Sequence, residues 1–205
     1  MIERIRDIRI ASISGSAQRN NNTEKALAFV HDELERMSGV EVIQILPRKL
    51  KLSFPGSTSD YPTRDRFLNM VKSADGLILA TPEYHGSLSS LMKLTIENLG
   101  FPSALEGKPL SLLGVAAGSI GAVKSLEHLR SVCSHVGALV LPGSVSIAHV
   151  RDVFDTAGNC LDPNIEGSLR RLPRRLIQYV VETTCPDSSF EEMIRYEMGI
   201  HSSTE

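Results

Sequence analysis

The stretch from Ile8 to Lys25 reads IRIASISGSAQRNNNTEK, and the rest of the chain is organised around it. It begins with a short apolar run, which is typical of a strand buried on both faces of a parallel sheet. A polar loop follows without a linker, and beyond it apolar residues recur at helical spacing from Ala26 to Met37. This order aims backbone N–H groups and the positive end of a helix dipole at one small volume. Such a volume favours an anion, most often a phosphate.

The polar loop can also be interpreted as an ordinary turn between a strand and a helix, with Asn22 or Thr23 as the helix N-cap. A turn of that kind needs one or two polar residues. This loop has eight whose side chains can hydrogen-bond a phosphate, namely Ser14, Ser16, Gln18, Arg19, Asn20, Asn21, Asn22 and Thr23. The density of these groups favours the phosphate hypothesis.

Composition and charge limit the classes of function. A chain of 205 residues is long enough for one α/β domain with a sizeable core. The formal net charge of −2 argues against a nucleic-acid or anionic-membrane surface, because both need a concentrated basic face. No apolar run approaches the length of a transmembrane helix, and the N-terminus lacks the core of a signal peptide. We therefore expect a soluble cytoplasmic protein.

The cysteines and histidines predict no metal site. Cys133, Cys160 and Cys185 are odd in number and widely spaced, which suits neither a disulfide framework nor a metal cluster. His128 and His135 lie close to Cys133 in the sequence, but on a helix Cys133 falls on a different face. We expect reduced thiols, with Cys133 as a packed core residue.

The rest of the chain alternates between strand and helix patterns. Further strands are predicted at 40–46, 76–80, 109–116 and 138–147, the last interrupted by Pro142-Gly143, and helices at 63–73, 87–99, 122–136 and 166–182. This alternation predicts a flavodoxin-like, doubly wound, five-stranded parallel sheet in the order 2-1-3-4-5. We expect one domain over residues 1–186, a long surface loop over 48–62, and a C-terminal tail over 187–205 that forms a short helix or frays.

In this topology the loops after strands one, three and four gather at one edge of the sheet. These are the three loops of unusual composition, SGSAQRNNNT after the first strand, TPEYHGS after the third and AGSIGA after the fourth. No G-x-G-x-x-G follows the first strand, and neither a phosphate-binding G-x-x-x-x-G-K-[ST] nor a nucleophile-elbow G-x-S-x-G is present. The usual dinucleotide, nucleotide triphosphatase and hydrolase interpretations are therefore disfavoured.

Together the three loops resemble the NADPH-dependent FMN reductase family, flavodoxin-like enzymes that include quinone, azo-dye and chromate reductases. The resemblance extends from residue 8 to about 150, and Pro82-Glu83-Tyr84 after a buried strand is its most specific part. Two positions depart from the family pattern. Gln18 stands where the family usually carries Arg, with Arg19 one step later, and Ala117 stands where the family often has Gly.

The resemblance implies a role for each loop. The residues implied to hold the FMN phosphate are Ser16, Gln18, Arg19, Asn22 and Thr23. Those implied to wrap the ribityl chain and one edge of the isoalloxazine are Pro82, Glu83, Tyr84 and His85, with Gly118 and Ser119 on its other side. NADPH (or NADH) would deliver hydride to the flavin, which then reduces a flavin, quinone or similar small acceptor. No catalytic side chain is expected, because the flavin carries the chemistry.

Individual side chains carry further expectations. Glu83 should point away from the flavin, into a subunit contact, because a carboxylate there would disfavour the reduced anion. His85 should contribute its backbone N–H and a wall of the flavin slot. A candidate contact for a homodimer, or for a homotetramer of two such dimers, is the apolar stripe on the helix after the third strand, made of Leu88, Leu91, Met92, Thr95 and Ile96.

Two other functions stay open. A flavodoxin-like electron carrier would bind FMN without nicotinamide turnover, but such carriers are typically strongly acidic, and −2 is weak for that role. A protein that kept the fold but lost the cofactor is suggested only by Gln18 and Ala117.

Overall fold

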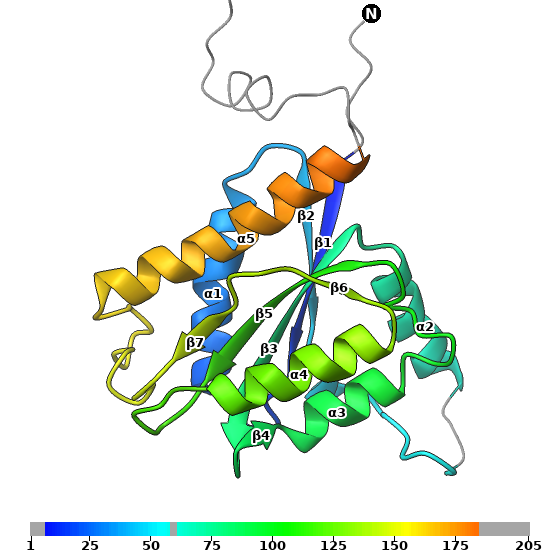
Figure 1. Ribbon diagram of the computed structural model, residues 1–205, viewed down its shortest axis with the longest axis horizontal. Coiled ribbons are helices and arrows are strands. Elements are labelled where there is room, and N and C mark those ends of the chain that lie inside the picture. Colours follow the sequence, from blue (N-terminus) through cyan, green and yellow to red (C-terminus); the bar gives the residue numbers. More distant parts are fainter. Residues whose placement is uncertain (1–6, 58–60, 185–205) are drawn as a thin grey trace, which may run out of the picture.

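A twisted, largely parallel sheet runs through the middle of the molecule (Figure 1). The computed structural model describes residues 7–57 and 61–184, so the tail predicted over 187–205 lies outside the described residues. The strands are β1 (Ile8–Ser14), β2 (Val40–Ile45), β3 (Gly76–Tyr84), β4 (Ser87–Leu88), β5 (Pro109–Val115), β6 (Leu139–Val140) and β7 (Val145–Ile147). Their order is β2-β1-β3-β5-β6, with β7 also parallel to β5 and β4 antiparallel to β3. The predicted fold class and strand order are confirmed.

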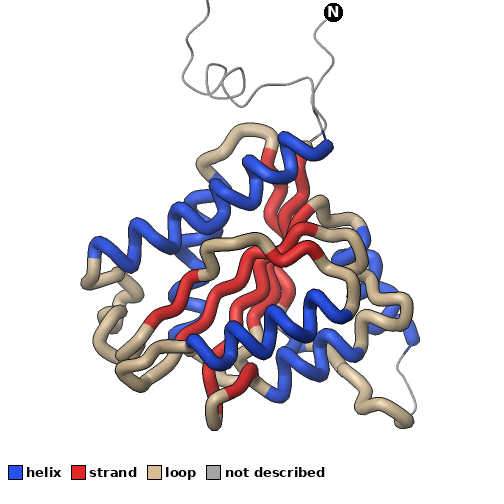
Figure 2. Tube along the Cα trace, in the orientation of Figure 1, coloured by secondary structure: helices blue, strands red, loops and turns tan. Residues whose placement is uncertain are grey.

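Helices cover both faces of this sheet (Figure 2). The helices are α1 (Asn22–Glu35), α2 (Tyr61–Lys72), α3 (Ser90–Glu97), α4 (Val123–His135) and α5 (Pro163–Thr184), with a 3₁₀ turn, η1 (Pro47–Lys49), after β2. One apolar cluster joins the sheet to α1 and α5, and a second joins it to α2, α3 and α4. None of the helices, within the ranges that the structure describes, is long and apolar enough to cross a membrane.

Alternation along the central strands supplies both clusters. Ile78 packs on the α1 and α5 side, whereas its neighbours Leu77 and Leu79 pack on the other side. Every residue of β5 is buried, as a strand covered on both faces requires. Gly114 in β5 lets α4 approach, since a Cβ there would lie 2.6 Å from the Ala122 Cβ.

The start of one predicted helix and the continuity of one predicted strand differ from the sequence prediction. The helix predicted over 87–99 begins only at Ser90, because Ser87 and Leu88 pair with Tyr84 and Glu83 as the second arm of a hairpin. The strand predicted over 138–147 is divided into β6 and β7, because Pro142 cannot donate to a ladder and Gly143 has φ +81°.

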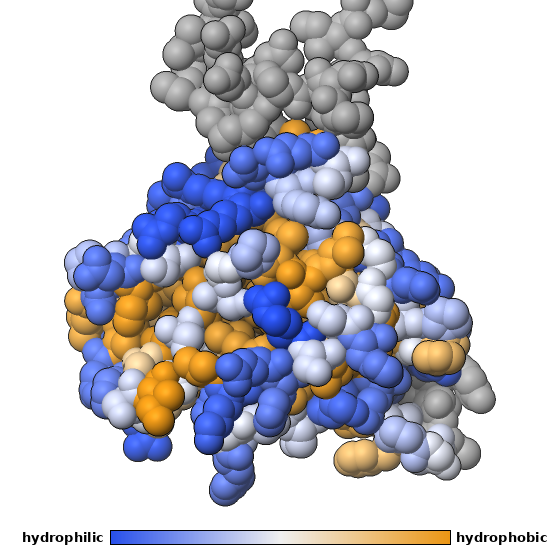
Figure 3. Space-filling view, viewed as in Figure 1, coloured by the Kyte–Doolittle hydropathy of each residue, from blue (hydrophilic) through white to orange (hydrophobic). Residues whose placement is uncertain are grey.

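The exposed edge of the sheet carries apolar side chains. Figure 3 shows them between the hydrophilic outer surfaces of α5 and α4, over β6 and β7. Leu139 in β6 is 47% exposed. The edge of the sheet is therefore less polar than the helices that flank it.

Candidate functional site

The loops after β1, β3 and β5 meet at the carboxyl edge of the sheet. In the parallel register Ser14 lies beside Ala80, and Pro82 lies beside Val115. Ser89, which follows the β3–β4 hairpin, joins the first two loops directly. Its hydroxyl donates to the Gly15 carbonyl oxygen at 2.6 Å, and its amide donates to the Thr81 hydroxyl at 3.1 Å. The structure thus brings the three groups of predicted site residues to one edge.

The first loop is shaped by Asn21, which is the N-cap of α1 in place of the predicted Asn22 or Thr23. Its backbone is extended, and its side-chain oxygen accepts from the Glu24 amide at 2.9 Å. Its side-chain amide donates to the Gln18 carbonyl oxygen at 2.7 Å and to Glu24 Oε1 at 2.9 Å. One side chain therefore fixes both the start of the helix and the turn before it.

Hydrogen-bond donors remain available in this loop. Within the described residues, no protein acceptor is paired with the backbone amides of Ser16, Ala17, Arg19, Asn20, Asn22 and Thr23. The Thr23 hydroxyl makes no hydrogen bond to any described residue, and the buried Ser16 hydroxyl receives only a long bond of 3.4 Å from the Gln18 amide. A cluster of N–H and O–H donors at a helix N-terminus fits a phosphate.

The exposed turn of the loop is less constrained. Gln18 and Arg19 are exposed, and neither side chain hydrogen-bonds or ion-pairs with another residue in the part of the chain that the structure describes. A different cation lies below the loop. Arg48, in η1, places Nη2 2.8 Å from Glu24 Oε2, and its side chain is only 16% exposed. Arg48 lies in the stretch predicted to be a surface loop, and the sequence analysis therefore did not predict its ion pair with Glu24.

The β3–β4 hairpin provides the second loop. β3 continues through Pro82 and Glu83 to Tyr84, and the reversal is made by His85 and Gly86 at φ +51° and +72°. Tyr84 is 44% exposed, and His85 is also exposed. The motif predicted as a loop is therefore a projecting strand end with its turn.

Glu83 has a hydrogen-bond partner within its own chain. Its Oε2 accepts a hydrogen bond at 3.0 Å from the amide of Ser125, in the first turn of α4. The N-cap residue of this helix, Ala122, has no side chain that could accept such a bond. Glu83 therefore caps α4 within the chain, where its charge also complements the helix dipole.

The third loop is braced by β7 and the segment after it. The Ala116 amide donates to the Ile147 carbonyl oxygen at 2.8 Å, and the Ala122 amide donates to the Ser146 hydroxyl at 2.9 Å. Between these anchors Gly118 and Ser119 are exposed. A Cβ placed on Gly118 would meet no atom within 4 Å, so this backbone borders open space. That space suits the close approach of a flat ring.

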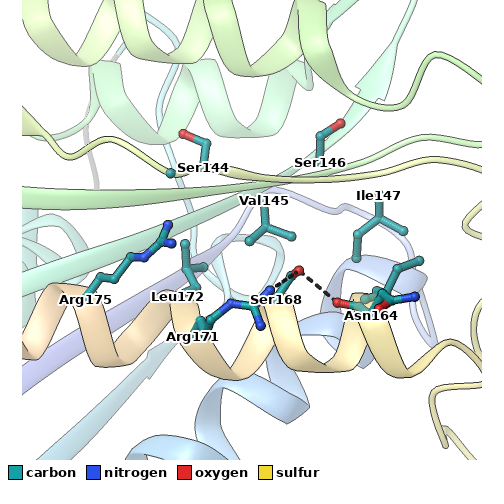
Figure 4. Close-up of a pocket in the computed structure, with 11 residues that line it drawn as sticks. Ser144, Val145, Ser146, Ile147, Asn164, Ser168, Arg171, Leu172 and Arg175 are labelled. Atoms are coloured by element: carbon teal, nitrogen blue, oxygen red, sulfur yellow. Dashed lines mark hydrogen bonds between the residues drawn. The ribbon is translucent and has the colours of Figure 1, made fainter.

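Two hollows border the site without being part of it. One, of about 370 Å³, lies between β7 and α5 and contains none of the predicted FMN-binding residues (Figure 4). Another, of about 380 Å³, lies between α1 and β2 and is lined partly by Glu24 and His31. Burial lowers the pKa of His31 to about 4, and its Nε2 lies 2.7 Å from the Ser12 hydroxyl.

Cys133 and His128, which are close in the sequence, have different surroundings in the structure. Cys133 is buried in the core, and burial raises its pKa to about 12. His128 instead lies 3.0 Å from the Ser87 hydroxyl of β4. Among the described residues there is no group of three histidine, cysteine or acidic side chains that could hold a metal ion.

Comparison with known proteins identifies the family. Residues 8–152 match the NADPH-dependent FMN reductase family. The chain belongs to this family. The predicted class, an FMN-dependent NAD(P)H oxidoreductase, is thereby confirmed, with FMN and a reduced nicotinamide as its cofactors.

Individual relatives agree with this placement. The chain is 31% identical over 166 residues to an NAD(P)H-dependent FMN reductase of Pseudomonas aeruginosa, covering 76% of this chain and 86% of that protein. It is 28% identical over 149 residues to an NADPH azoreductase of a Bacillus species, covering 71% and 80%. In fold it is similar to FerB, a flavoenzyme NAD(P)H:acceptor oxidoreductase from Paracoccus denitrificans. The TM-score is 0.71 at 19% identity, over 85% of this chain and 98% of that one.

Proposed function

We propose that this member of the family passes hydride from NADPH or NADH, through FMN held by residues 1–186, to a flavin, quinone or similar small acceptor. The observation that carries the proposal is the meeting of the three loops at one edge of the sheet, with the first two joined by the bond from Ser89 to Gly15. The Bacillus relative, an NADPH azoreductase, supports a small-molecule acceptor.

The first loop would hold the FMN phosphate. Its unpaired amides and the hydroxyls of Ser16 and Thr23 are the donors, and the N-terminus of α1 adds its partial positive charge. Asn22 begins the helix beside them. Gln18 and Arg19 are exposed on the turn, where they can reach an anion without being held by another residue.

The other two loops would enclose the isoalloxazine and the ribityl chain. Pro82 shapes the end of β3, while Tyr84 and His85 stand exposed at the hairpin reversal. Gly118 and Ser119 leave open backbone on the opposite side. When bound, FMN supplies the hydride chemistry itself. The protein's part is to position the ring and to keep the Glu83 carboxylate bonded to Ser125.

Flavin absorbance of the purified protein tests this function. We expect a yellow protein, or one that binds added FMN, whose flavin absorbance is bleached by NADPH without oxygen. Steady NADPH oxidation with a quinone would exclude a carrier that only docks on other proteins. A colourless protein that does not quench FMN fluorescence would overturn the proposal and favour a fold that lost its cofactor.

We also infer a homodimer, or a homotetramer of two such dimers, that works in the cytoplasm. The exposed Tyr84, Ile120 and Val123 near the site support an assembly that covers apolar surface there. Most of the stripe first considered for this contact is engaged elsewhere, since Met92, Thr95 and Ile96 are buried in the core. Light scattering that gives a monomer mass would contradict the assembly, and cell fractionation tests the location.

A further inference from the structure

A carboxylate lies directly below the loop that would hold the phosphate. Glu24 is in the first turn of α1, and its two oxygens have different partners. Oε1 accepts from the Asn21 side chain at 2.9 Å and from the Ser14 hydroxyl at 3.4 Å. Oε2 accepts from Arg48 at 2.8 Å. Glu24 is therefore a fixed part of the loop's support.

This acid creates an electrostatic conflict. The positive end of α1 stabilises a nearby anion, and a phosphate dianion and the Glu24 carboxylate would both be close to it. Like charges in a partly buried setting repel more strongly than in water. Yet Glu24 holds Asn21, which in turn holds the Gln18 carbonyl oxygen, so the loop's shape depends on it.

Arg48 forms an ion pair with this acid. Glu24 is its one ion-pair partner among the residues described, and the two side chains are only 16% and 25% exposed. Among the residues that the structure describes, Arg48 Nε and Nη1 have no hydrogen-bond partner although both are buried, so the partner that holds the guanidinium there is Glu24. β2 pairs with β1, and η1 follows it, which brings Arg48 to the base of the loop.

We propose that Arg48 is a positioning residue for the FMN phosphate: it cancels the charge of Glu24 while leaving that carboxylate free to hold Asn21 and the loop. The inference rests on the proposed function, since it concerns the same phosphate. It assigns the compensation of the Glu24 charge to a residue outside the three loops, because the exposed Arg19 is not held in a fixed position by another described residue.

The test compares two ligands that differ only in the phosphate. FMN and riboflavin are titrated by flavin fluorescence into the full chain and into R48M, E24Q and the double variant R48M/E24Q. We expect R48M to weaken FMN binding about tenfold and riboflavin binding less than about twofold, since only FMN meets the exposed Glu24 charge. The double variant should recover most of the FMN affinity, because the uncompensated acid is gone.

E24Q alone provides an independent arm if R48M does not fold. It leaves the Arg48 charge uncancelled, so FMN should bind as tightly as to the original chain or more tightly, with riboflavin unchanged. R9M is the matched control, because Arg9 pairs with Glu41 at 2.7 Å at the start of β1 and β2, where both side chains are about half exposed. It should change neither affinity.

The outcomes separate the two proposals. Equal losses for FMN and riboflavin in R48M, no recovery in the double variant, or weaker binding of both flavins by E24Q would make the pair merely structural and overturn the inference. An original chain that binds neither flavin would instead overturn the proposed function.

Discussion

Ser89 is hydrogen-bonded to Gly15 across two loops, with 2.6 Å between the Ser89 hydroxyl and the Gly15 carbonyl oxygen. The same hydroxyl accepts from the Met92 amide at 3.0 Å and so caps α3. We expect Ser89→Ala to lower the free energy of unfolding by about 1–2 kcal/mol and to weaken FMN binding, since both the cap and the link are lost. Urea denaturation and FMN titration measure the two effects. Ser73→Ala, at an exposed hydroxyl that donates to the Met70 carbonyl oxygen, is the control, and an equal effect in both variants would contradict the role of Ser89.

Removal of the cap on α4 should also destabilise the fold. Glu83→Ala leaves the Ser125 amide without its acceptor, so we expect a loss of about 0.5–2 kcal/mol in the free energy of unfolding. Glu83→Gln keeps an acceptor and should lose less. Glu127→Ala, at an exposed position on the same helix, serves as the comparison in thermal unfolding. If Glu83→Ala and Glu127→Ala lowered the stability equally, the bond from Ser125 to Glu83 would not stabilise the fold.

Alanine substitutions at Gly114 in β5 and at Gly118 in the loop after it should affect different properties, stability in the first case and FMN affinity in the second. Gly114→Ala puts a Cβ 2.6 Å from the Ala122 Cβ, and we expect it to cost about 1–3 kcal/mol of stability by overpacking. Gly118→Ala adds its methyl to open space, so stability should change by less than about 0.5 kcal/mol while FMN affinity falls. Urea denaturation measures the stability of both variants, and FMN titration measures their affinity for the cofactor. Unchanged FMN affinity in Gly118→Ala would place the flavin elsewhere.

Acid should destabilise the protein partly through His31. Burial lowers the pKa of this imidazole from 6.5 to about 4, so between these values the unfolded chain binds the proton and the folded chain does not. The stability that neutral His31 contributes is present above about pH 6.5 and is lost as the pH falls towards 4. We expect His31→Gln to reduce this loss by about 1–3 kcal/mol in urea denaturation at pH 7 and pH 4.5. Parallel pH curves for the two proteins would argue against the assignment.

The thiol of Cys133 should resist modification in the folded protein. Its burial raises the pKa to about 12, which leaves almost no thiolate at pH 8. We expect iodoacetamide to label Cys133 only in urea, and the half-buried Cys160 to react before it in buffer. Peptide mass spectrometry after labelling measures both rates, and rapid native labelling of Cys133 would show that α4 opens.

Local signals were enough to predict the sheet and the meeting of the three loops at one edge of it. The buried run of β1, the density of donors after it and the Pro-Glu-Tyr segment each act over a few residues. The N-cap was within reach too, because Asn21 is followed three residues later by Glu24, a spacing typical of helix starts. The N-cap was assigned to the wrong residue because Asn20, Asn21 and Asn22 are consecutive and each can cap a helix.

What could not be predicted depends on partners distant in sequence. Leu88 and Leu91 have helical spacing, yet Ser87 and Leu88 are strand because Tyr84 and Glu83 pair with them. Likewise nothing near Arg48 indicates that its partner is Glu24, in the first turn of another helix. Long-range pairing overrode local pattern in both places.

The division of the predicted strand 138–147 into β6 and β7 also bears on aggregation in concentrated solution. Two short segments on either side of Pro142-Gly143 do not offer the continuous row of unpaired amide and carbonyl groups that templates growth into fibrils. We therefore expect the apolar rim over β6 and β7 to recruit strands of another molecule less readily than one unbroken edge strand would.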